Sequence, residues 1–232
     1  MKSNAVRTTL VRFSATAVLS LGAIGSAFAV DYNYEPELDA IYGQASFGVS
    51  PIDIRFLPTQ TLFDTSLLSI DSEEKFNALD AIGGASPLVS AFLVNSITFC
   101  GGPAAPGTSI DGCGQTPGHI LAFNYGVNAV VFAHELGHNL NLGHDDISLG
   151  NIMGSSSGFD DRLFTLEQTA AILSSPLVQT DAAGKFISIQ LYNVVASVPE
   201  PSTYAMFALG LAGVGFLRKR KTAKAADASA TA

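Results

Sequence analysis

The stretch NAVVFAHELGHNLNLGHDD, residues 128–146, decides how this chain is interpreted, because it holds three of the four histidines. Its apolar residues recur at spacings of three and four, which predicts an amphipathic helix with Asn128 as its N-cap. These residues are Ala129, Phe132, Leu136 and Leu140. His134 and His138 lie one helical turn apart, on the side roughly opposite that stripe. The stretch therefore predicts a helix that buries one face and offers two imidazoles to a cleft.

Two histidines at this spacing are typical zinc ligands, and a catalytic Zn²⁺ takes three protein ligands and keeps a fourth position for water. His144 is the expected third ligand, so the chain must leave the helix and reverse after Leu140. Asn141 is expected to make this reversal with a positive φ, where glycine is usual, at a cost of about 1 kcal/mol. Glu135 is the expected general base, which takes a proton from the zinc-activated water and passes it to the leaving amine.

The spacing HExxHxxxxxH followed by Asp145 resembles the metzincin zinc metalloproteases, and an acid directly after the third histidine is most similar to the adamalysin/reprolysin branch. Residues 151–154, NIMG, resemble the Met-turn of that clan, in which Met153 would form a hydrophobic floor below the ligands. The resemblance covers mainly residues 118–154. It implies an α/β (α+β) fold: a metzincin-like catalytic domain with a twisted mixed sheet, an active-site helix and a smaller C-terminal part.

The chain departs from this pattern at Asn141 and at Ser155, where some branches carry a tyrosine ligand. Asp145 is expected to support the ligands from behind, and its carboxylate to anchor the loop through backbone hydrogen bonds rather than to bind calcium. The segment GHILAF, residues 118–123, is expected to be an edge strand with which an extended substrate pairs. The loop 155–161 would then shape the pocket beyond the scissile bond.

The rest of the body alternates strand and helix patterns. Strands are expected at 51–58, 87–99 and 185–196, and helices at 69–82, capped by Asp71 or Ser72, and at 165–174, opened by a capping box. The strand–helix–strand order of the first three elements predicts a parallel pair with a crossover.

The chain has two cysteines, Cys100 and Cys113, on either side of a Gly/Pro-rich loop. In an oxidising compartment they are expected to form a disulfide worth about 3 kcal/mol, with two free thiols as the alternative. Residues 30–197 contain four basic and eighteen acidic residues, a net charge of −14 without histidine. Such a surface repels nucleic acid and anionic membranes, and most of its carboxylates are expected to be solvated.

Both ends of the chain indicate export. Residues 1–29 have the basic start, the apolar run and the Ala-Phe-Ala end of a signal peptide. Residues 30–197 form the expected protease domain, and residues 198–221 combine Pro-Glu-Pro, an apolar run and a basic cluster, which predicts transient membrane contact. Residues 222–232 are an Ala-rich tail on the cytoplasmic side.

The segment 198–221 resembles the PEP-CTERM sorting signal. In that family an exosortase recognises and cuts the tail, and the protein is released or attached at the surface of Gram-negative bacteria that make extracellular polysaccharide. The expected function is therefore a secreted zinc-dependent endopeptidase that acts on proteins or peptides. Two alternatives stay open: a zinc protease whose third ligand is Glu167, and a non-catalytic surface or matrix protein stabilised by zinc.

Overall fold

The computed structural model describes residues 34–155, 162–197 and 208–212. The expected signal peptide, the tail 222–232 and most of 198–221 lie outside the described residues, and 208–212 are helical. None of the described helices has the length and apolar character needed to cross a membrane.

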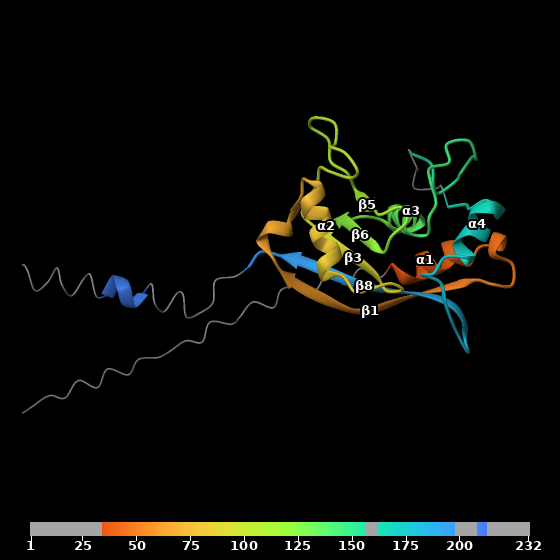
Figure 1. Ribbon diagram of the computed structural model, residues 1–232, viewed down its shortest axis with the longest axis horizontal. Helices are drawn as coiled ribbons and strands as arrows, with labels where there is room; N and C mark the ends of the chain where they lie inside the picture. The colour runs from red at the N-terminus through yellow and green to blue at the C-terminus, as the bar shows by residue number, and fades with distance from the viewer. Residues whose placement is uncertain (1–33, 156–161, 198–207, 213–232) are drawn as a thin grey trace, which may run out of the picture. The chain divides into compact units, whose positions relative to one another are not determined.

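The body is built on a six-stranded mixed sheet in the order β1-β8-β3-β6-β5, with β7 added beside β8 (Figure 1). Four strands run parallel, while β5 is antiparallel to β6 and β7 to β8. The strands are β1 (Ile52–Phe63), β3 (Val89–Val94), β5 (Gly112–Gly114), β6 (Ile120–Asn124), β7 (Gln179–Asp181) and β8 (Gly184–Val195). This mixed sheet with a few helices confirms the expected α+β class.

The expectation of a neighbouring parallel pair from 51–58 and 87–99 was wrong in one respect. β1 and β3 are parallel, but β8 lies between them and pairs with both. β1 also continues past Pro58 to Phe63, with a register shift between Leu57 and Gln60, because a proline without an N–H fits a sheet where the ladder is interrupted. The predicted strand 87–99 divides into β3 and β4 (Ser96–Ile97), and β4 pairs with β2 (Ser69–Ile70) in a separate small sheet.

The helices cover both faces of the sheet, because the buried strands have apolar side chains on both sides. Within β3, Ala91 and Leu93 belong to one core, while Phe92 and Val94 belong to the other. The first core includes α1 (Glu35–Tyr42), α3 (Ala129–Asn139) and α4 (Leu166–Leu173). The second includes α2 (Glu73–Ile82). Two short 3₁₀ helices, η1 (Ala45–Phe47) and η2 (Thr65–Leu67), complete the body.

The predicted helix starts are confirmed. The Asn128 side chain accepts from the backbone N–H groups of Val130 and Val131 at the start of α3. Ser72, rather than Asp71, caps α2, and Thr165 forms the expected capping box with Gln168 at the start of α4. These caps satisfy N–H groups that a helix leaves without an internal partner, and so fix where each helix begins.

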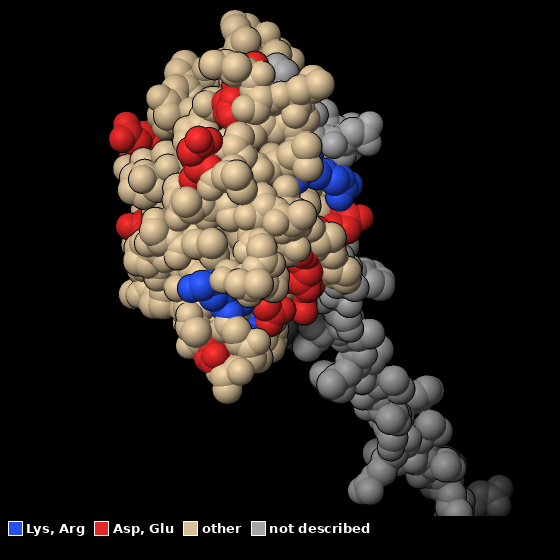
Figure 2. All heavy atoms as spheres, turned by 90° about the vertical axis from the view of Figure 1, so that its right-hand side faces the viewer, with Lys and Arg blue, Asp and Glu red and all other residues tan. Residues whose placement is uncertain are grey.

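The surface charge is dispersed. On the face drawn in Figure 2, acidic side chains are spread among uncharged residues, and the few basic side chains lie next to acidic ones. Arg55, for example, forms ion pairs of 2.6 Å with Asp53 and with Asp181. The acidic balance of the sequence thus does not by itself mark a binding site.

Candidate metal centre

Helix α3 has two different faces. Phe132 and Leu136 are fully buried in the first core, while His134 and His138 are half-buried and line a cleft. The i, i+4 spacing puts both imidazoles on one side of the helix, as the sequence predicted. The core contacts therefore fix the orientation in which the helix presents its histidines.

The chain reverses at Asn141, as expected. Its φ is 70°, and it is the only residue other than glycine with a positive φ among the described residues. The N–H of Asn141 donates to the His138 carbonyl at 2.9 Å, and that of Leu142 to the Gly137 carbonyl at 3.0 Å. This pair of bonds is a Schellman motif, which ends the helix and turns the backbone back towards the cleft.

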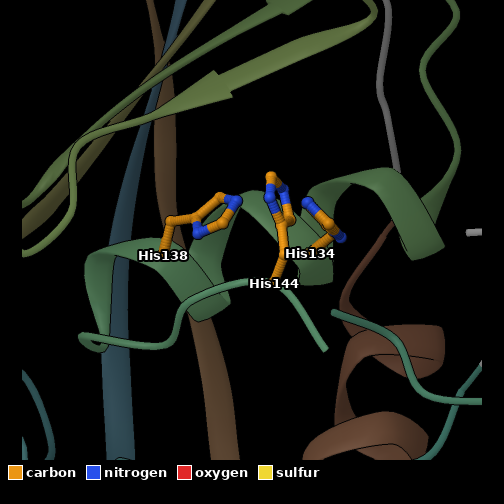
Figure 3. Close-up of side chains that lie close together, drawn as sticks. All are labelled: His134, His138 and His144. Atoms are coloured by element: carbon orange, nitrogen blue, oxygen red, sulfur yellow. The ribbon is translucent and has the colours of Figure 1, made fainter. Parts of the chain in front are cut away.

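After this turn His144 joins the first two histidines (Figure 3), and possible ligand atoms of the three side chains lie within 4.8 Å of one another. The Nδ1 atom of His134 lies 2.7 Å from the Ile152 carbonyl, and that of His138 lies 2.8 Å from the Leu142 carbonyl. A carbonyl at Nδ1 places the proton on that nitrogen, so Nε2 carries the lone pair that a metal requires.

The electrostatics of these histidines also suit a metal. Burial lowers the pKa of His134 to about 4, and burial likewise lowers the pKa of His138 below its ordinary value. Both imidazoles are therefore neutral at pH 7, which is the form that binds a cation. Three imidazoles with ligand atoms this close together fit Zn²⁺ in a site with an open fourth position.

The segment 151–154 packs against α3 and contacts the first histidine. Met153 is fully buried, and a Cβ added at Gly137 would collide with its Sδ atom, so the methionine packs directly against α3. The Met153 N–H donates to Asn151 Oδ1 at 2.8 Å, and the Met153 carbonyl accepts from the Asp145 N–H at 2.8 Å. The segment thus holds the loop that carries the third histidine.

Asp145 anchors this loop, as the sequence suggested, and Asp146 acts in the same way. The Asp145 carboxylate accepts from the N–H groups of Ile147 and Ser148 and from the Ser148 hydroxyl, and Asp146 accepts from the N–H and hydroxyl of Ser155. These hydrogen bonds lower the pKa of both carboxyls. Neither aspartate belongs to the group of possible metal ligands.

Glu135 belongs to α3, and its side chain lies between this helix and β5 at the edge of the sheet. Its exposed fraction is 9%, and its carboxylate accepts a hydrogen bond from the Gly114 N–H. Burial raises the pKa of Glu135 to about 7, although the hydrogen bond from Gly114 acts in the opposite direction. A carboxyl with a pKa near neutrality can both accept and return a proton.

The histidines and Glu135 open into a cleft of about 760 Å³. The opposite wall is formed by α2, β5 and the segment that carries the first cysteine, and it includes Glu73, Phe76, Phe99, Cys100, Gly112, Cys113 and Gly114. Cys100 and Cys113 form the expected disulfide. Sequence reasoning missed the role of this wall, for which the only signal was a cysteine flanked by two glycines.

The fourth histidine and the alternative third ligand lie elsewhere. His119 does not line the cleft; its Nε2 atom is 3.4 Å from Asp80 Oδ1. Glu167 is exposed in the first turn of α4 and is not in the histidine group. The expectation that 118–123 is an edge strand was wrong, because β6 pairs with β3 on one side and β5 on the other. Most of the loop 155–161 lies outside the described residues.

Comparison with known proteins identifies one segment. A family model of the PEP-CTERM protein-sorting motif matches residues 197–221. No curated protein and no solved structure matches the chain. The chain thus carries a sorting motif that indicates export to the cell surface in Gram-negative bacteria and recognition by an exosortase-type enzyme.

Proposed function

We propose that the chain is an exported zinc endopeptidase of the metzincin type. The observation that carries this proposal is the convergence of three imidazoles beside a buried glutamate at one end of an open cleft. When bound, Zn²⁺ supplies a Lewis acid for the scissile carbonyl and lowers the pKa of its water ligand towards about 7.

The residues of the chain have separate roles in this proposal. His134, His138 and His144 hold the ion, and the backbone carbonyls at Nδ1 of the first two fix their ring orientation. Glu135 receives a proton from the attacking water and returns it to the leaving amine. Met153 supports α3 by packing against Gly137, which lies between His134 and His138 in the sequence. The cleft excludes part of the solvent around the reacting bond, which strengthens the electrostatic contribution of each group.

The substrate strand is assigned to β5 in place of β6. Among the described residues β5 pairs on one side only, with β6, and both of its glycines line the cleft next to Glu135. An extended peptide could add to this edge and bring a carbonyl to the three histidines that would hold the metal, with main-chain hydrogen bonds providing alignment. This mode requires an unfolded or flexible substrate segment, and we therefore propose that proteins are cut in such segments.

In this proposal the reaction takes place outside the cell, and the sorting motif supports that location. Residues 197–221 direct the chain to an exosortase-type enzyme, and transient membrane contact through the tail precedes release or surface attachment. The acidic body would stay clear of the anionic membrane surface by repulsion.

The decisive experiment compares the wild-type protein with Glu135→Gln on a peptide library, with a chelator control. We expect the variant to keep one equivalent of zinc and to lose about 10²–10⁴-fold in kcat, the usual contribution of a general base. If the wild-type protein binds zinc but cleaves no peptide or unfolded protein, the zinc is structural and the protease proposal fails.

A further inference from the structure

The edge strand β5 approaches α3 unusually closely at Glu135. A Cβ added at Gly112 would lie 2.7 Å from Glu135 Cγ and 3.0 Å from Val131 Cγ1, and one added at Gly114 would lie 2.6 Å from the Glu135 carbonyl oxygen. Only glycine permits this approach. The same contact lets the Gly114 N–H donate to the Glu135 carboxylate. The strand therefore both covers and orients the glutamate.

The residue between the two glycines, Cys113, is held by a disulfide bond. Cys113 is buried and joined to Cys100 by the disulfide, and both cysteines line the cleft. β5 is only three residues long, and a loop with no regular helix or strand connects it to β4. β5 also pairs with β6, but the disulfide is the covalent tie that fastens the middle of this short strand to the segment after β4.

The metal ligands are independent of this arrangement. All three histidines come from α3 and the loop that follows it, and the rings of His134 and His138 contact the carbonyls of Ile152 and Leu142 in the same stretch. The disulfide bridges none of these residues. Loss of the disulfide should therefore disturb Glu135 while leaving the ligand set in place.

We propose that the Cys100–Cys113 disulfide positions Glu135 through β5, so that the chain can bind zinc when reduced but hydrolyses peptides only when oxidised. The inference rests on the proposed protease function. It makes activity depend on passage into an oxidising compartment, since disulfides persist outside the cytosol and not within it. Cys113, Gly112 and Gly114 are positioning residues in this scheme, because they act through Glu135.

The activating step is a thiol–disulfide exchange with an external disulfide, either of a protein or of a small molecule. The thiolate of one cysteine attacks a sulfur of the donor, forms a mixed disulfide and expels the first donor thiol. The thiolate of the second cysteine then displaces the other donor sulfur. The two cysteines lose two electrons to the donor, and their two protons end on its two thiols.

The first test measures the zinc content and kcat of the full chain and of three variants. The double variant Cys100→Ser/Cys113→Ser is compared with the wild-type protein, and Gly112→Ala is compared with Gly102→Ala. Gly102 is the matched control, because it lies in the loop that leads to β5 and a Cβ there meets nothing within 4 Å. We expect one equivalent of zinc in all four proteins. We expect kcat to fall about 10²-fold in the double-serine and Gly112→Ala variants, the loss that a displacement of about 1 Å can cause, with a smaller change in KM. Gly102→Ala should match the wild-type protein.

The second test needs neither metal nor turnover. Hydrogen exchange of residues 112–116 is measured in the metal-free oxidised protein, in the double-serine variant and in Glu135→Ala. The Gly114 amide should exchange slowly in the first and at least about tenfold faster in the other two, while α3 keeps its protection. Equal exchange in all three, or full kcat in the double-serine variant, would overturn the proposal. If the oxidised protein hydrolyses nothing but the exchange rates differ as expected, the protease function fails and the positioning of Glu135 by β5 stands.

Discussion

The two walls of the cleft are built in different ways. The metal-binding wall is one continuous stretch from His134 to Met153, and hydrogen bonds within this stretch hold it, such as those of His138 with Leu142 and of Asp145 with Met153. The opposite wall combines α2, Phe99 and β5, which come from separate parts of the chain. The difference teaches that a local sequence motif can define a metal site, whereas the surface that completes the active site depends on the tertiary fold.

This contrast has a functional consequence. Changes in the metal-binding wall should alter zinc affinity, because they alter the ligands or their supports. Changes in the opposite wall should leave zinc bound and alter only turnover or the ionisation of Glu135. The following predictions test this division, and the first has the largest expected effect.

Replacing His144 by alanine should lower zinc affinity by more than about 10²-fold, because even the loss of a group that only supports a ligand costs 10–100-fold. The measurement is zinc content after dialysis against a competing chelator. His119→Ala is the matched control, since His119 lies outside the cleft. If His144→Ala retains zinc and Glu167→Ala loses it, the third ligand is the glutamate. The metal site would then not be formed by one continuous stretch.

The ionisation of Glu135 reports on the opposite wall. In the metal-free protein its folded-state pKa is about 7, against an ordinary value of 4.5, because burial disfavours the charged form. Its contribution to stability is therefore complete below pH 4.5 and is lost as pH rises through 7. Glu135→Gln cannot ionise, so at pH 8 the metal-free variant should be more stable than the wild-type protein by ~3 kcal/mol.

Denaturant unfolding of both metal-free proteins between pH 4 and pH 8 measures this difference. The histidines are common to both, so their own titration cancels. The gap between the two proteins should shrink when Cys100 and Cys113 are also replaced by serine, because a loosened β5 lets water reach the carboxylate. A gap that does not change with pH would mean that the wall does not desolvate Glu135.

The sequence was sufficient for those features that depend on near neighbours. The Asn128 cap, the Asn141 reversal, the capping box of α4 and the disulfide all follow from residue types within short stretches. The grouping of His134, His138 and His144 follows from helical periodicity and one turn.

Features that depend on distant pairing were not predictable in the same way. β8 is the last strand of this sheet along the chain, yet it lies between β1 and β3. Nothing in its alternation of apolar and polar residues specifies these partners. β5 has only three residues, too few for a periodic signal, and its role becomes visible only when Gly112 meets Glu135. The longer and more apolar 118–123 was therefore mistaken for the edge strand.

The smallest predicted effect concerns Asn141 in the metal-binding wall. Its φ of 70° suits asparagine and glycine, whereas alanine in this left-handed region is disfavoured. Asn141→Ala should lower the free energy of unfolding of the metal-free protein by about 1 kcal/mol, and Asn141→Gly should change it by less than about 0.5 kcal/mol. Urea unfolding distinguishes the two variants.

Because the reversal at Asn141 sets the position of His144, Asn141→Ala should also bind zinc more weakly, while kcat at saturating zinc stays unchanged. An alanine variant with normal zinc affinity and reduced kcat would show that the turn acts on Glu135, and would contradict the separation of the two walls.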